Sequence, residues 1–135
     1  MPLSIMIVED ESDIAYLFSL CLERLGFNTI SFTDPLSALD HFKKYQNRYC
    51  LILIDMFMVE LNGLGLSKEI RKYNSQVKIL LITGCCKGDI TRSIDFKVAK
   101  ISDVILKPVN FEILGPRILQ LCSEKSLGNS DSKIR

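Results

Sequence analysis

Short runs of aliphatic residues recur along the chain, separated by longer segments of mixed polarity. Three of these runs, residues 3–8, 50–54 and 77–82, are dominated by Ile, Leu and Val and do not alternate with polar positions. Runs of this length and composition are typical of strands buried on both faces of a parallel sheet. We therefore expect three central strands.

Two further segments have the pattern of edge strands. Residues 27–32 alternate, so that Phe27 and Thr29 share one face, which suits a strand with one partly exposed side. Residues 103–106 form a short apolar run that ends just before Pro108, and proline cannot continue strand pairing. These two strands are expected at the edges of the sheet.

Between the runs, apolar residues recur at intervals of three and four, the spacing of helices with one buried face. Gly26 is a natural C-terminal cap for the first helix, and Asp34 followed by Pro35 begins the second. Pro116 lies within the last helix, and we expect a break near residues 112–115 because proline removes one hydrogen bond there. The five expected helices cover residues 14–25, 35–45, 65–73, 89–99 and 111–121.

Strands that alternate with helices along one chain predict an α/β protein with a doubly wound parallel sheet. A flavodoxin-like strand order of 2-1-3-4-5 would place the alternating second strand and the short fifth strand at the edges, where their patterns fit. The chain has 135 residues, enough for one domain. We expect this domain over residues 1–125 and a disordered tail over residues 126–135, where polar residues replace the apolar periodicity.

The composition excludes several classes of function. Lys and Arg number 17 against 16 Asp and Glu, so no basic footprint indicates direct nucleic-acid binding. No apolar run approaches the ~20 residues needed to cross a bilayer, and no secretory signal opens the chain, so we expect no membrane insertion and a cytoplasmic location. The five cysteines form neither a paired framework nor a metal motif and are expected to be reduced thiols.

Charged and polar residues gather where the expected strands end. Glu9, Asp10 and Glu11 follow the first strand, Asp55 ends the third, Thr83 ends the fourth, and Lys107 follows the fifth. In an open α/β sheet the carboxyl ends of the strands form the functional edge. We therefore expect these side chains to converge.

The acidic members of this group predict a divalent cation. Carboxylates a few ångströms apart raise each other's pKa unless a cation lies among them, and oxygen ligands suit Mg²⁺, whose shell is often completed by a phosphate oxygen. Asp55 could then act as a nucleophile in phosphoryl transfer, with Lys107 offsetting charge and the Thr83 hydroxyl donating to a phosphate oxygen. Alone, each residue has a simpler structural explanation; Glu11 is best explained as a helix-capping or solvated carboxylate.

In combination these motifs resemble the receiver domain of two-component response regulators, over residues 3–124. The resemblance implies that a sensor histidine kinase phosphorylates Asp55, with Mg²⁺ held by Glu9 or Asp10, by Asp55 and by the backbone carbonyl of Phe57. It also implies that Lys107 pairs with the phosphate. The matching pieces are residues 7–11, 53–56, 62–63, 82–84 and 106–108, the last with an expected cis peptide before Pro108.

The chain departs from the family pattern at several positions. Val59 replaces a proline after the phosphorylated strand, and Val104 replaces the usual aromatic switch residue, which leaves the coupling to output open. Phe57 and Cys85 flank the route by which water reaches the aspartyl phosphate in the family. Apolar groups there cannot orient water, and we expect a long-lived phosphorylated state.

Without an output domain of its own, such a receiver would switch the binding of an unknown protein target or relay phosphate to a histidine phosphotransfer protein. The family's usual partner or homodimer surface is the face formed by helix 4, strand 5 and helix 5. An alternative is a pseudo-receiver, an interaction module that phosphorylation does not control. A flavodoxin-like cofactor protein is disfavoured because Glu9, Asp10 and Glu11 stand where a phosphate-binding loop would be needed.

Overall fold

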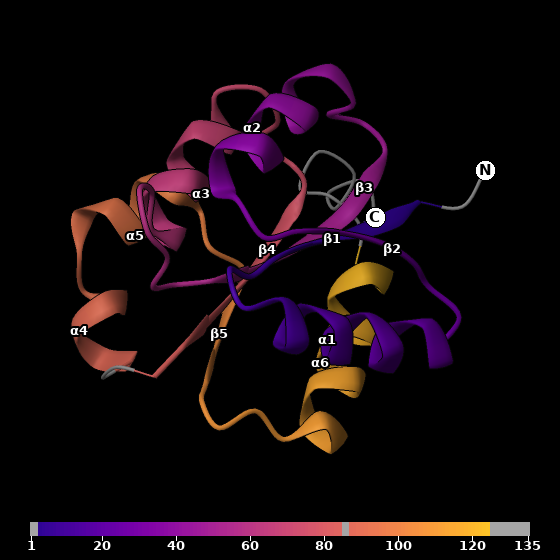
Figure 1. The fold of residues 1–135 in the computed structure, drawn as a ribbon. Helices are drawn as coiled ribbons and strands as arrows, with labels where there is room; N and C mark the ends of the chain where they lie inside the picture. The colour runs from indigo at the N-terminus through magenta and orange to yellow at the C-terminus, as the bar shows by residue number, and fades with distance from the viewer. Residues whose placement is uncertain (1–2, 85–86, 125–135) are drawn as a thin grey trace, which may run out of the picture.

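Five parallel strands form one sheet in the computed structural model, which describes residues 3–84 and 87–124 (Figure 1). The strand order is β2-β1-β3-β4-β5, which confirms the expected topology. Residues 126–135, expected to form a disordered tail, and both cysteines at 85 and 86 lie outside the described residues. The strands are β1 (Ser4–Val8), β2 (Asn28–Phe32), β3 (Tyr49–Asp55), β4 (Lys78–Thr83) and β5 (Asp103–Leu106).

The burial of each strand follows its hydrophobic pattern. All of β1 and nearly all of β3 and β4 are buried, as expected of strands covered on both faces. The edge strand β2 is partly exposed along its whole length, and β5 is buried only at Val104 and Ile105. The carboxyl ends of the central strands are therefore anchored in the buried core.

Helices cover both faces of the sheet (Figure 1). On one face, α1 (Ser12–Arg24) and α6 (Phe111–Ser123) pack through Phe18, Leu114 and Ile118. The other face carries α2 (Pro35–Lys44), α3 (Gly63–Arg71), α4 (Lys87–Thr91) and α5 (Ile94–Ala99). No helix in the described part of the chain is long and apolar enough to cross a membrane.

The helix ends agree with the capping residues in the sequence. The Asp34 carboxylate accepts hydrogen bonds from the backbone N–H groups of Leu36 and Ser37, both at 3.3 Å, and Pro35 is the first residue of α2. Gly26 follows α1 with a φ of +96°, a conformation that glycine adopts without steric cost. The third helix begins at Gly63, two residues before the expected start, because Asn62 caps it.

Two expectations about the helices are wrong. The single helix expected over residues 89–99 is two helices, α4 and α5, because the Ser93 hydroxyl caps a new helix by accepting from the Phe96 N–H. The break expected near residues 112–115 is absent, since α6 is a continuous helix around Pro116. Pro116 and Glu112 are both exposed, so water can satisfy the carbonyl that the proline leaves unpaired.

Candidate functional site

Three carboxylates converge at the carboxyl ends of β1 and β3. Glu9 and Asp10 follow β1, and Asp55 is the last residue of β3, the strand that pairs with β1. One carboxylate oxygen from each lies within 4.8 Å of the others. Glu9 is only 1% exposed and Asp55 4%, whereas Asp10 is the most exposed of the three. The parallel register of the two strands thus creates the predicted acidic cluster.

Lys107 reaches the same cluster from the end of β5. Its backbone N–H donates to the carbonyl of Thr83 at 2.8 Å, which aligns the two strand ends. Its ammonium group lies 3.0 Å from Asp55 Oδ1, and the Lys107–Pro108 peptide is cis, as expected. Apart from this ion pair, Asp55 Oδ1 has no hydrogen-bond partner among the described residues.

Burial sets the electrostatics of the cluster. Desolvation, aided by the nearby charge of Asp55, raises the pKa of Glu9 to about 7, although the Glu11 N–H and Lys107 oppose this rise. Burial also raises the pKa of Asp55, even though Lys107 favours the carboxylate. Partial burial alone would lower the pKa of Lys107, but the contact with Asp55 raises it. The positive charge of Lys107 therefore does not fully offset the cost of burying the Glu9 and Asp55 carboxylates.

The unsatisfied oxygens fit a hard cation. Glu9 Oε2 accepts from the Glu11 N–H at 3.1 Å, but Glu9 Oε1 is buried without a hydrogen-bond partner in the part of the chain that is described. Buried carboxylate oxygens are normally paired or bound to metal. An all-oxygen donor set with one ligand open to solvent is suited to Mg²⁺, which retains several waters.

The other predicted site residues occupy the same edge of the sheet. Thr83 is fully buried at the end of β4, the neighbour of β3 on the side away from β1. The Phe57 side chain is 56% exposed, in the loop after Asp55. Glu11 occupies the N-cap position of α1 without a side-chain capping bond and is not a member of the acidic cluster. Cys85 lies outside the described residues.

Gly63 supports the site in a way that the sequence pattern did not explain. A Cβ at this position would lie 2.8 Å from the Asp55 carbonyl oxygen and 2.9 Å from Met56 Cα, closer than the backbone can tolerate. The Gly63 N–H also donates to the Met56 carbonyl at 2.8 Å. The glycine therefore lets the start of α3 press against the backbone that carries Asp55.

The loop between Asp55 and Asn62 contains a tight turn at Glu60. Glu60 has a φ of +76°, and the Leu61 N–H donates to the Val59 carbonyl at 2.9 Å, a turn that is rare for a residue with a side chain. Val59 beside it is 75% exposed. No sequence signal indicates this turn, because glycine or asparagine would be expected there.

An α/β sheet of this order with an acidic cluster, a lysine and a buried threonine at its carboxyl edge is the arrangement expected of a receiver domain. The model of the response regulator receiver domain matches residues 5–118. The chain belongs to this family.

The relatives and solved structures agree with that assignment. The chain is 34% identical over 115 residues to the "Transcriptional regulatory protein CpxR homolog" of Haemophilus influenzae, covering 84% of this chain and 48% of that protein. It is 31% identical over 114 residues to "Response regulator ArlR" of Staphylococcus aureus, covering 84% and 50%. The chain thus spans about half the length of the curated relatives it matches.

The fold is also that of solved receiver domains. The structure superposes on a response regulator receiver domain protein from Clostridium thermocellum with a TM-score of 0.80 at 22% identity, covering 99% of this chain and 100% of the other. It superposes on the chemotaxis protein CheY4 of Vibrio cholerae with a TM-score of 0.80 at 20% identity, covering 90% and 99%. At these identities the likeness concerns the fold.

Proposed function

We propose that Asp55 accepts a phosphoryl group from a sensor histidine kinase in a Mg²⁺-dependent reaction. The observation that carries the proposal is the position of the Asp55 carboxylate, buried beside Glu9 and Asp10 and 3.0 Å from the Lys107 ammonium. A nucleophile fixed on a central strand and surrounded by charge-compensating groups is what phosphoryl transfer requires.

In this reaction an Asp55 carboxylate oxygen attacks phosphorus, and the bond from phosphorus to the donor nitrogen breaks. Glu9, Asp10, Asp55 and the carbonyl of Phe57 would hold Mg²⁺, which supplies positive charge to the phosphate oxygens. Lys107 already contacts Asp55 and would move its ammonium to a phosphate oxygen as the carboxylate becomes an acyl phosphate. The buried Thr83 hydroxyl would donate to another phosphate oxygen.

The phosphorylated state should be long-lived. Phe57 lies two residues after Asp55, and its exposed aromatic side chain offers no hydrogen bond to a water molecule that approaches the acyl phosphate. At this position hydrolysis then lacks a side chain that orients the attacking water. Persistent phosphorylation suits a protein that signals by changing its binding partner or that passes phosphate on to a histidine phosphotransfer protein.

The partner surface of this receiver is proposed to involve β5 and α6. Leu106 and Ile113 are exposed and line a hollow of about 250 Å³ between these elements, and Ile94 on α5 is 77% exposed. Exposed apolar side chains of this kind suit a protein partner or a second copy of the chain. Val104 is buried and has no ring that could swing, so a rotating aromatic side chain at this position cannot carry the signal from Asp55 to this surface.

A gel-mobility experiment tests the proposed function. The full chain is incubated with acetyl phosphate and Mg²⁺ and separated on a gel that retards phosphoproteins, with Asp55→Asn and an EDTA sample as controls. The proposal predicts a retarded band only for the wild-type chain with Mg²⁺. An unretarded wild-type band would favour the alternative of a pseudo-receiver, for which the buried Val104 is the supporting observation.

A further inference from the structure

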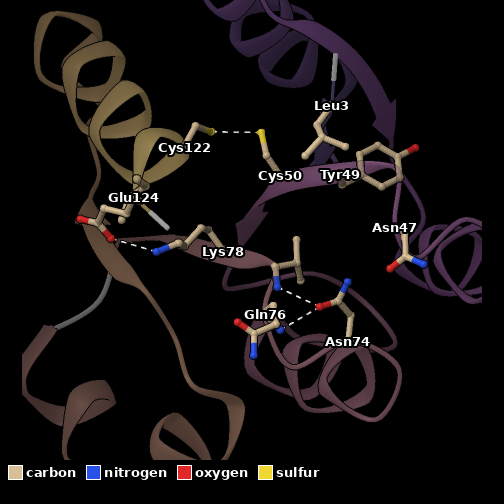
Figure 2. Close-up of a pocket in the computed structure, with 11 residues that line it drawn as sticks. Leu3, Asn47, Tyr49, Cys50, Asn74, Gln76, Lys78, Cys122 and Glu124 are labelled. Atoms are coloured by element: carbon tan, nitrogen blue, oxygen red, sulfur yellow. Dashed lines mark hydrogen bonds and ion pairs between the residues drawn. The ribbon is translucent and has the colours of Figure 1, made fainter. Parts of the chain in front are cut away.

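Two cysteines meet at the end of the sheet opposite the acidic cluster (Figure 2). Cys50 is the second residue of β3, and Cys122 lies in the last turn of α6. Their Sγ atoms are 3.1 Å apart although 72 positions separate them in the sequence. Both are free thiols with partial exposure. Asp55 lies at the other end of β3, so the pair is separate from the phosphorylation site.

The pair is held together by its surroundings and is open to small molecules. Both cysteines line a hollow of about 260 Å³, into which a small oxidant can diffuse. Lys78 on β4 forms an ion pair with Glu124 at 2.9 Å, and this contact fixes the end of α6 against the sheet (Figure 2). Leu121, the neighbour of Cys122, is buried in the same core cluster as Leu51, the neighbour of Cys50, and this packing keeps the two cysteines side by side.

We propose that Cys50 and Cys122 are a redox modification site at which a hydroperoxide, such as hydrogen peroxide, converts the two thiols into an intramolecular disulfide. A disulfide requires a sulfur separation of about 2.05 Å, so the Sγ atoms must approach by about 1 Å. Side-chain rotation and a small shift of the last turn of α6 supply this movement, since Cys122 is the penultimate residue of that helix.

The chemistry proceeds in two balanced steps. The Cys50 thiolate attacks one peroxide oxygen, the O–O bond breaks, and hydroxide leaves to give a sulfenic acid on Cys50. The Cys122 thiolate then attacks Cys50 Sγ, the S–S bond forms, and the S–O bond breaks with a second hydroxide as leaving group. With hydrogen peroxide, the two thiol protons convert the hydroxides to water, so two thiols and one hydrogen peroxide yield one disulfide and two waters.

The local electrostatics assign these roles to the two sulfurs. Either sulfur can donate in this contact; when Cys122 donates, the hydrogen bond lowers the pKa of Cys50, against the effect of burial, which favours Cys50 as the first thiolate. The same hydrogen bond and burial raise the pKa of Cys122, while the ammonium of Lys78 lowers it. Oxidation of Cys50 removes its negative charge, so Cys122 ionises more readily for the second step.

The disulfide would fasten the end of α6 to the start of β3. It would close a long loop in the unfolded chain, which reduces the conformational freedom of the unfolded state. The oxidised protein should therefore resist unfolding better than the reduced protein. This proposal does not rest on phosphorylation of Asp55, and the same disulfide is expected in an Asp55→Asn variant.

Peptide mapping tests the proposal directly. The reduced full chain is treated with hydrogen peroxide without Mg²⁺ or phosphodonor, free thiols are alkylated, and the protein is digested with trypsin. Cleavage after Lys and Arg places Cys50 in peptide 49–68 and Cys122 in peptide 118–125, apart from Cys21 and from the pair at 85 and 86. The proposal predicts that these two peptides become linked, with a mass lower by two hydrogens, and that dithiothreitol separates them.

Three variants and a second readout complete the experiment. Cys50→Ser and Cys122→Ser should each abolish the link, whereas Cys21→Ser should leave it unchanged. The urea midpoint of the wild-type chain should rise on oxidation, and that of Cys50→Ser should not. Recovery of Cys50 and Cys122 as alkylated thiols, or in disulfides with other cysteines, would overturn the proposal.

Discussion

The folded chain buries the Glu9 carboxyl group, and burial disfavours its charged form. Burial raises its pKa to about 7, above its ordinary value of 4.5. Because the folded state holds the proton more tightly than the unfolded state, the stability of the metal-free protein should fall as the pH rises from 4.5 to 7. The loss should be of the order of 1–3 kcal/mol.

Urea unfolding in EDTA at pH 5.5 and pH 8 measures this dependence. Glu9→Gln should flatten it and should be more stable than wild type at pH 8, and added Mg²⁺ should restore the stability of the wild-type chain at pH 8. The prediction is contradicted if the metal-free wild-type chain is more stable at pH 8 than at pH 5.5 and Glu9→Gln has the same pH dependence. Burial of the charged Glu9 would then not destabilise the fold.

Phe57 is proposed to leave the water that attacks phosphorylated Asp55 without a hydrogen-bond partner. An amide at this position could hydrogen-bond the attacking water, so Phe57→Asn should shorten the lifetime of the phosphorylated state by about tenfold. The decay of the retarded band after removal of the phosphodonor measures the lifetime. Phe57→Leu, which is also apolar, is the matched control, and equal lifetimes for all three chains would rule out this role for Phe57.

At the scale of elements, the contact between the start of α3 and the end of β3 positions Asp55. Gly63→Ala would place a Cβ against the backbone of Asp55 and Met56. The variant should lose about 1–3 kcal/mol of unfolding free energy and should be phosphorylated more slowly. Gly65→Ala is a control in the same helix, since its Cβ would meet only the flexible side chain of Leu61 and the Asn62 cap.

These two variants are compared by urea unfolding and by the rate at which the retarded band forms with acetyl phosphate. Alanine is favoured over glycine in a helix by roughly 0.5–1 kcal/mol, so Gly65→Ala should be neutral or more stable than wild type. If Gly63→Ala matched Gly65→Ala in stability and rate, the close approach of α3 would have no bearing on the site.

Helix α6 contains a proline that it accommodates without a break. Pro116→Ala would restore the N–H that donates to the Glu112 carbonyl, and the site is exposed, so no cavity is created. The variant should gain about 1–3 kcal/mol of unfolding free energy from the restored hydrogen bond. The conformational entropy that the unfolded chain regains without the proline reduces this gain. Pro35→Ala, at the first position of α2 where no N–H is needed, should bring no gain in the same urea measurement.

The elements differ in how far the sequence predicts them. The central strands and the Asp34 cap follow from local patterns, because burial on two faces and a capping carboxylate each leave a signature in a few residues. The division between α4 and α5 does not follow from a local pattern. Ile90 and Ile94 are four apart and suggest one helical face, yet Ile90 is buried and Ile94 is 77% exposed. Which of them meets the core depends on tertiary packing.

At the scale of the whole molecule, the predicted site follows from topology. Once the strand order is known, Glu9, Asp55, Thr83 and Lys107 must lie at one edge, because parallel strands end together. The order also brings Cys50 and Cys122 to the opposite edge, but a pattern of five cysteines does not say which sulfurs approach each other. The turn at Glu60 and the fit of Gly63 depend on side-chain space that a sequence pattern does not record.

The most direct test of the account is the stoichiometry and location of phosphate on the full chain. Intact mass spectrometry with acetyl phosphate should show one phosphoryl group per chain with Mg²⁺ and none with EDTA, and fragmentation of tryptic peptide 49–68 should place it on Asp55. Lys107→Ala should be labelled more slowly. No label with Mg²⁺, or a label on another residue that persists in Asp55→Asn, would contradict the claim that this edge of the sheet activates Asp55.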